Sequence, residues 1–139
     1  FFEQFDGLTV PLVDDEVGNH GFYAFPLLFD IEKVNVSRSK IIAALAAEGL
    51  NGFMDGYVNL SEWIFFKNKI GYGSNGFPWS ASGKVYQYGK ELTPIATELH
   101  SEKLLGFEMC LYELGEKDLQ LFKTAFTKVW ENLDELRQG

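Results

Sequence analysis

The chain has 139 residues and a formal net charge of −8 at pH 7. This length suits one domain with a single core, and two arginines among twelve basic residues argue against a nucleic-acid partner. Cys110 is the only cysteine, which excludes an internal disulfide. Neither an apolar membrane span nor a signal-peptide pattern occurs. We therefore expect a cytoplasmic protein with no membrane partner.

The first residues are expected to form the last turn of a helix. Phe1 and Phe5 are four apart, and Gly7 follows as a stop. A brief extended piece is expected at residues 8–10. With thirteen Phe and three Trp in the chain, the core should be built largely from aromatic rings.

A strand is expected within residues 22–30, followed by a helix within residues 37–49. The strand contains Pro26, which cannot donate to a ladder, so an edge position or a bulge is expected. The helix should begin after Ser37 as the capping residue and end at Gly49. A second strand is expected at residues 50–54, before an apolar segment at residues 60–66.

A long region rich in Gly, Ser, Tyr and Asn covers residues 67–90. Residues 71–76 match G-x-G-x-x-G, but proline and another glycine-rich turn follow where a dinucleotide site needs a helix. The pattern therefore indicates a glycine-rich loop. The two histidines and Cys110 do not have the spacing of metal ligands, so no metal site is expected.

The C-terminal third predicts a helix, a strand and a second helix. Thr93 should cap the first helix, with Pro94 at its first position and an end near Lys103. A short strand is expected at residues 104–109. The last helix should begin near Gly115 and continue unbroken, because its apolar residues step by three and four. These residues are Leu119, Phe122, Phe126, Val129, Leu133 and Leu136.

These elements predict an α+β fold. A small, mostly antiparallel sheet from residues 22–30, 50–54 and 104–109 should be covered on one face by the helices. Phe122, Phe126, Val129 and Leu133 should be buried against that sheet. Spacing and composition alone assign no reaction.

The order of several short motifs carries a resemblance to a known family. The motifs are Tyr-Ala-Phe-Pro-Leu-Leu-Phe-Asp at residues 23–30, Ser37-Arg38, Ala-Leu-Ala-Ala-Glu-Gly-Leu at residues 44–50, Gly56-Tyr57, Phe77-Pro78-Trp79, residues 93–99, Asp118 and residues 129–133. Together they resemble the C-terminal small domain of the DegT/StrS family of sugar aminotransferases, which use pyridoxal phosphate. The resemblance covers nearly the whole chain, so residues 1–139 are expected to be a single domain and residues 1–7 the end of an interdomain helix.

The resemblance implies a role in enclosing a substrate. In that family the large N-terminal domain holds pyridoxal phosphate and the Schiff-base lysine, and none of those motifs is present here. The chain alone is therefore expected to be inactive and to bind no cofactor. Its partner would be that N-terminal domain, and the substrate a keto sugar, a nucleotide-linked sugar or a cyclitol.

Four residues are candidates for substrate binding by resemblance. Tyr57 matches the Gly-Tyr position, while Asn59, Trp63 and Trp79 lie in matching segments. Their side chains have the chemistry that sugar recognition uses, although core aromatics and a turn asparagine are an alternative interpretation. Residues 58–63 replace the usual proline- and tyrosine-bearing run, so the substrate stays open.

A second function class stays open beside the first. The chain could be a stand-alone module that binds small molecules or proteins, with the same fold and no catalysis. If instead a partner domain is missing, Phe1, Phe2 and Phe5, with parts of residues 71–79, should form an exposed apolar patch or be covered in a homodimer.

Overall fold

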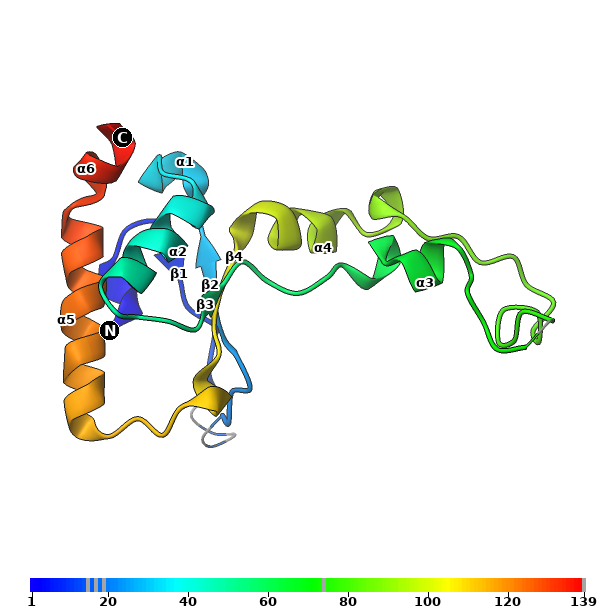
Figure 1. The fold of residues 1–139 in the computed structure, drawn as a ribbon, viewed down its shortest axis with the longest axis horizontal. Coiled ribbons are helices and arrows are strands. Elements are labelled where there is room, and N and C mark those ends of the chain that lie inside the picture. The colour runs from blue at the N-terminus through cyan, green and yellow to red at the C-terminus, as the bar shows by residue number, and fades with distance from the viewer. Residues whose placement is uncertain (15, 17, 19, 74, 139) are drawn as a thin grey trace. The chain divides into compact units, whose positions relative to one another are not determined.

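The computed structural model describes residues 1–139 except 15, 17, 19, 74 and 139, and has an α+β fold (Figure 1). The described residues form two compact units. The core unit comprises residues Phe1–Gly56 and Glu102–Gly139, and the aromatic unit comprises Tyr57–Ser101. The expectation of a single domain stays a prediction.

A four-stranded antiparallel sheet forms the centre of the core unit. Its strands are β1 (Leu8–Thr9), β2 (Phe25–Phe29), β3 (Phe53–Met54) and β4 (Leu104–Phe107), in the order β1-β2-β4-β3. Three of the four lie where the sequence predicts strands, and β1 lies in the predicted extended piece. The predicted fold class is confirmed.

The prediction of an edge position for the strand that contains Pro26 is wrong. β2 pairs with β1 on one side and β4 on the other, and Pro26 lies opposite Gly106 of β4. β1 is so short that it pairs only with Leu28 and Phe29. Pro26 therefore has a strand on one side only, and a residue without an N–H is tolerated where no ladder partner faces it.

The helix predicted within residues 37–49 is confirmed as α2 (Arg38–Ala47), after a short helix α1 (Ile31–Val34). The Ser37 side chain accepts a hydrogen bond from the Lys40 N–H, as a capping residue does. Gly49 adopts a φ of +90°, a left-handed conformation that residues with a Cβ avoid. Ile41 and Leu45 of this helix are fully buried in the core.

The last helix is broken once, against the prediction of a continuous helix. It comprises α5 (Glu116–Glu131) and α6 (Leu133–Gln138), separated at Asn132. The Asn132 side chain donates to the Lys128 carbonyl at 2.7 Å, so it bonds to the backbone of the helix that it ends. The apolar stripe still continues across the break, because Leu133 is buried.

Phe126 of α5 is the centre of the aromatic core. Its fully buried ring lies 5.0 Å from Phe2, 5.2 Å from Phe5 and 5.2 Å from Trp130, measured between ring centroids. The predicted burial of the stripe is confirmed for Phe126, Val129 and Leu133, whereas Phe122 is half-buried and packs against the core. The prediction of a ring-built core is confirmed as well.

The exposed patch expected for the N-terminal phenylalanines is present only in part. A single turn of 3₁₀ helix, η1 (Phe2–Gln4), brings them to α5. Phe5 is buried, Phe2 is half-buried and Phe1 keeps 40% of its surface exposed. The expectation is wrong for Phe5 because its ring packs on Phe126 and Trp130 of the same chain.

The aromatic unit consists of short helical elements and a long loop. Its elements are η2 (Leu60–Glu62), α3 (Ile64–Lys67), η3 (Lys90–Leu92), α4 (Pro94–Glu98) and the start of a π-helical stretch, η4 (Leu99–Lys103). The helix predicted from Thr93 to Lys103 is present but changes to π geometry after Glu98. Thr93 is not a side-chain cap as predicted, and its hydroxyl accepts a bond from Asn59 instead.

The central position of Phe126 generates a stability prediction. Phe126→Ala should lower the free energy of unfolding of the core unit by about 3–5 kcal/mol, because it removes a fully buried ring and leaves a cavity. Leu121→Ala is the matched control, since Leu121 lies on the same helix with 69% of its surface exposed. Its effect should stay within about 0.5 kcal/mol. Urea unfolding followed by circular dichroism measures both, and similar losses in the two variants would contradict the arrangement.

Candidate functional site

Asn59, one of the four predicted substrate residues, takes part in three side-chain hydrogen bonds. Its Nδ2 donates to the hydroxyl oxygens of Thr93 at 3.2 Å and Thr97 at 3.0 Å. Its Oδ1 accepts from the Ser61 N–H at 3.1 Å, at the start of η2. With 8% of its surface exposed, Asn59 joins two helical segments that are more than thirty residues apart.

Ser61 extends this network to the end of the long loop. Its hydroxyl donates to the Gly89 carbonyl at 3.0 Å and accepts from the Gly89 N–H at 2.9 Å. Thr97 in turn donates to the Lys90 carbonyl at 3.3 Å. We call Asn59, Ser61, Gly89, Thr93 and Thr97 the polar network. Its hydrogen bonds join the two ends of the long loop.

Trp79 belongs to a cluster of three rings beside that loop. Its centroid lies 6.2 Å from that of Phe66, which in turn lies 5.4 Å from Tyr88. The Trp79 Nε1–H donates to the Tyr88 hydroxyl at 3.3 Å. All three rings are half-buried, so each keeps part of its surface open to a ligand.

Tyr57 and Trp63 are the more exposed candidates. Tyr57 retains 49% of its surface and Trp63 retains 44%, and the Trp63 ring packs edge-on against Phe65 at 5.4 Å. Trp63, Trp79 and Asn59 thus contact different neighbours within the aromatic unit. Their role in substrate binding stays a prediction.

The aromatic unit buries little of its apolar surface. Among its described residues only Asn59 and Gly89 are buried. Large apolar side chains that are exposed there include Val58, Leu60, Trp63, Ile64, Phe65, Ile70, Tyr72, Phe77, Leu92 and Ile95. Exposed apolar side chains that gather in one patch are typical of a surface that binds a ligand or a partner.

The glycine-rich motif at residues 71–76 forms a loop closed on itself. The Tyr72 N–H donates to the Phe77 carbonyl at 2.8 Å, and a Cβ at Gly71 would lie 2.2 Å from that same carbonyl oxygen. Apart from Ser74, which lies outside the described residues, the motif and residues 77–83 contain turns and no helix. The interpretation as a loop is therefore confirmed for the part that the structure describes.

The partners of Asn59 and Trp79 were not predicted from the sequence. Ser61, Thr93 and Thr97 hold Asn59, and Phe66 and Tyr88 hold Trp79. The spacing of Thr93 and Thr97, four apart on one helical face, is a signal that could have indicated a shared partner. Nothing in the local sequence links Asn59 to that face.

The described residues offer neither a metal-binding cluster nor a helix that could span a membrane. They include no group of three or more His, Cys, Asp or Glu side chains arranged to hold a metal ion. None of their helices combines the length and the apolar character needed to cross a bilayer.

Comparison with known proteins gives two distant relatives. The spore coat polysaccharide biosynthesis protein SpsC of Bacillus subtilis is 31% identical over 77 residues, which cover 55% of this chain and 20% of SpsC. The uncharacterized protein MJ1066 of Methanocaldococcus jannaschii is 29% identical over 77 residues, covering 55% of this chain and 19% of that protein. No family model matches. The chain thus matches about a fifth of the length of these curated relatives, one of which is named for polysaccharide biosynthesis.

The polar network predicts a local loss of stability. Asn59→Leu should destabilise the aromatic unit by about 1–3 kcal/mol, because three hydrogen bonds are lost and their partners are left unpaired. With 5-fluorotryptophan, fluorine NMR in urea should show the Trp79 transition at lower denaturant. Trp130, which lies in the core unit, should be unaffected.

Asn75→Leu serves as the matched control for Asn59→Leu, since Asn75 is exposed in the same unit. It should leave the Trp79 transition where it is in the unmodified chain. An unchanged Trp79 transition in Asn59→Leu would show that the network does not hold the unit together.

Proposed function

We propose that this chain is the C-terminal small domain of a pyridoxal-phosphate-dependent aminotransferase that acts on a keto sugar, a nucleotide-linked sugar or a cyclitol. The observation that carries the proposal is the 31% identity to a polysaccharide biosynthesis protein over more than half of the chain. The α+β fold with its small antiparallel sheet agrees with the resemblance to the DegT/StrS family.

The aromatic unit would form a wall of the substrate site. Exposed aromatic rings offer flat apolar faces, and hydrogen-bonding groups beside them fix the orientation of a polar ligand. Tyr57, Trp63 and Trp79 supply such rings, and the Tyr88 hydroxyl lies beside Trp79. Asn59 would support the wall from within, because its amide is already bonded to Ser61, Thr93 and Thr97.

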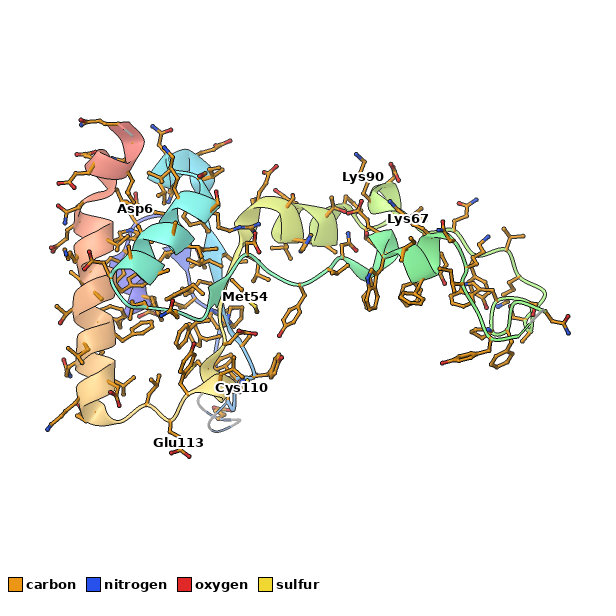
Figure 2. All side chains as sticks on the ribbon, in the orientation of Figure 1. Asp6, Met54, Lys67, Lys90, Cys110 and Glu113 are labelled. Carbon is orange, nitrogen blue, oxygen red and sulfur yellow. The ribbon has the colours of Figure 1, made fainter. Side chains whose placement is uncertain are left out.

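The lysines of this chain do not fit the role of cofactor anchor. All ten are exposed, and Lys67 and Lys90 of the aromatic unit illustrate their surface positions (Figure 2). A lysine that reacts with a carbonyl at neutral pH needs a desolvated site or a cationic neighbour to lower its pKa. The residues that hold pyridoxal phosphate would therefore belong to the rest of the parent protein.

The proposal is tested on the protein encoded by the whole reading frame that contains this chain. Supplied with pyridoxal phosphate, it should transfer the amino group of glutamate or glutamine to at least one member of a panel of keto sugars and keto-cyclitols. Absence of transfer and of cofactor absorbance would favour the alternative of a non-catalytic binding module.

The wall predicts a specific kinetic effect in that enzyme. Tyr57→Ala should raise the KM for the sugar acceptor about tenfold, which corresponds to about 1.4 kcal/mol of lost binding, with little effect on the half-reaction of the amino donor. Tyr23→Ala is the control, since Tyr23 lies in the core unit and retains 63% of its surface exposed. Equal effects on acceptor and donor steps would argue against a wall.

The 139-residue chain alone should not bind pyridoxal phosphate covalently. Mixed with pyridoxal phosphate and borohydride, it should give no stoichiometric adduct at any one lysine, because every lysine is exposed and none has a desolvated environment. Peptide mass mapping provides the measurement. One fully modified lysine would contradict the assignment of the anchor to another part of the parent.

A further inference from the structure

A cavity in the core unit is lined almost entirely by apolar side chains. It has a volume of about 170 Å³ and lies between η1, the strands and the first half of α5. Phe2, Phe25, Phe107 and Phe122 supply rings, Met109 lies at the edge, and Lys123 is the charged residue of the lining. This cavity plays no part in the proposed function.

The size of the cavity matches one aromatic ring. Cavities of about 150 Å³ lined by Leu, Ile and Phe stay dry and bind benzene. In this cavity Phe107 is buried, whereas Phe1 and Met109 keep 40% and 37% of their surface exposed. The exposed residues leave one side open, so a guest can enter without unfolding the core.

The rings around the cavity pack against one another edge to face. Phe2 and Phe122 meet edge to face at 88°, with their centroids 6.1 Å apart, and Phe107 and Phe122 meet at 62° and 5.1 Å. Edge-to-face rings present positive edges and negative faces side by side, and both attract a further ring. An aliphatic guest would gain the apolar contact without this electrostatic match.

Lys123 gives the cavity a charge preference. Its Nζ lies 6.0 Å from the centroid of the Phe1 ring, and no ion pair to it is found among the residues that the structure describes. In a chain with a net charge of −8, a lysine left unpaired beside an apolar cavity favours an anionic group at the outer end of a guest.

We propose that this cavity binds a small aromatic carboxylate, with the ring among Phe2, Phe107 and Phe122 and the carboxylate beside Lys123. The ring supplies most of the binding through burial of apolar surface. The ion pair is close to solvent, so it adds selectivity for an anion more than affinity.

The test uses the 139-residue chain with ¹³C-labelled methionine methyl groups and phenylacetate as the probe. The chain has two methionines: Met109 is part of the cavity lining, and Met54 of β3, which Figure 2 labels, is not. Phenylacetate should shift the Met109 methyl resonance in a saturable manner and leave that of Met54 unchanged. No shift, or equal shifts of both methyl groups, would overturn the proposal.

Two comparisons test separately what the aromatic ring of the guest and the charge of Lys123 contribute to binding. Cyclohexylacetate should bind more weakly than phenylacetate, and equal affinity would overturn the preference for an aromatic ring. Lys123→Glu should weaken phenylacetate binding about two- to fivefold, as expected for an exposed ion pair. Lys117→Glu, on the same helix but outside the lining, is the control. Equal weakening in both variants would overturn the role of Lys123.

A variant that fills the cavity completes the test. Leu119→Trp replaces a partly exposed leucine of the lining by a larger, aromatic side chain. It should abolish the shift that phenylacetate causes in the Met109 methyl resonance. An unchanged Met54 resonance in this variant shows that the sheet is intact. Persistent binding with that resonance unchanged would place the guest elsewhere.

Discussion

The ring of Phe126 is the contact on which the core unit depends. It joins η1, β3 and α5, because Phe2, Phe5 and Phe53 all pack on it within 6 Å between centroids. Aromatic rings bury a large area with few rotatable bonds, so a short chain can close its core with them. The sheet is small, and rings from the helices and the N-terminal turn complete the burial of its covered face.

The aromatic unit is held together by hydrogen bonds more than by a buried apolar core. Its described residues include only two that are buried, and one of these is a polar asparagine. Hydrogen bonds from Asn59 and Ser61 organise the segments, while tryptophan, tyrosine and phenylalanine rings remain wholly or partly exposed. A segment that buries so little apolar surface gains little free energy by folding alone. This is the property expected of a wall that becomes ordered against a partner, and it supports the proposed role in enclosing a substrate.

The sequence predicted those parts of the fold in which local signals and tertiary packing agree. Ser37, the aliphatic stripe and Gly49 all indicate the same helix, and the structure confirms it as α2. The helix break at Asn132 was not predicted, because the apolar period continues across it while the asparagine bonds to the helix backbone. The interior position of β2 was missed since the effect of Pro26 depends on how far β1 extends, which no local pattern gives.

The contacts of the candidate site also could not be predicted from local sequence patterns. Residue types and the family resemblance selected Asn59 and Trp79. Apart from Ser61, which is two residues from Asn59, their hydrogen-bond partners lie nine to thirty-eight residues away. The position of Thr93 before a proline favours a capping role. In the structure, however, the Thr93 hydroxyl accepts a hydrogen bond from the Asn59 side chain. Long-range hydrogen bonds of this kind leave no periodic trace in a single sequence.

Hydrogen exchange, measured by mass spectrometry, tests most directly the claim that the two units differ in their need for a partner. In the 139-residue chain, amides of β2, β4 and α5 should be strongly protected, whereas those of residues 57–101 should exchange at least tenfold faster. In the protein encoded by the whole reading frame, protection of residues 57–101 should rise toward that of the core unit. Equal protection of the two units in the 139-residue chain, with no rise in the longer protein, would contradict this account.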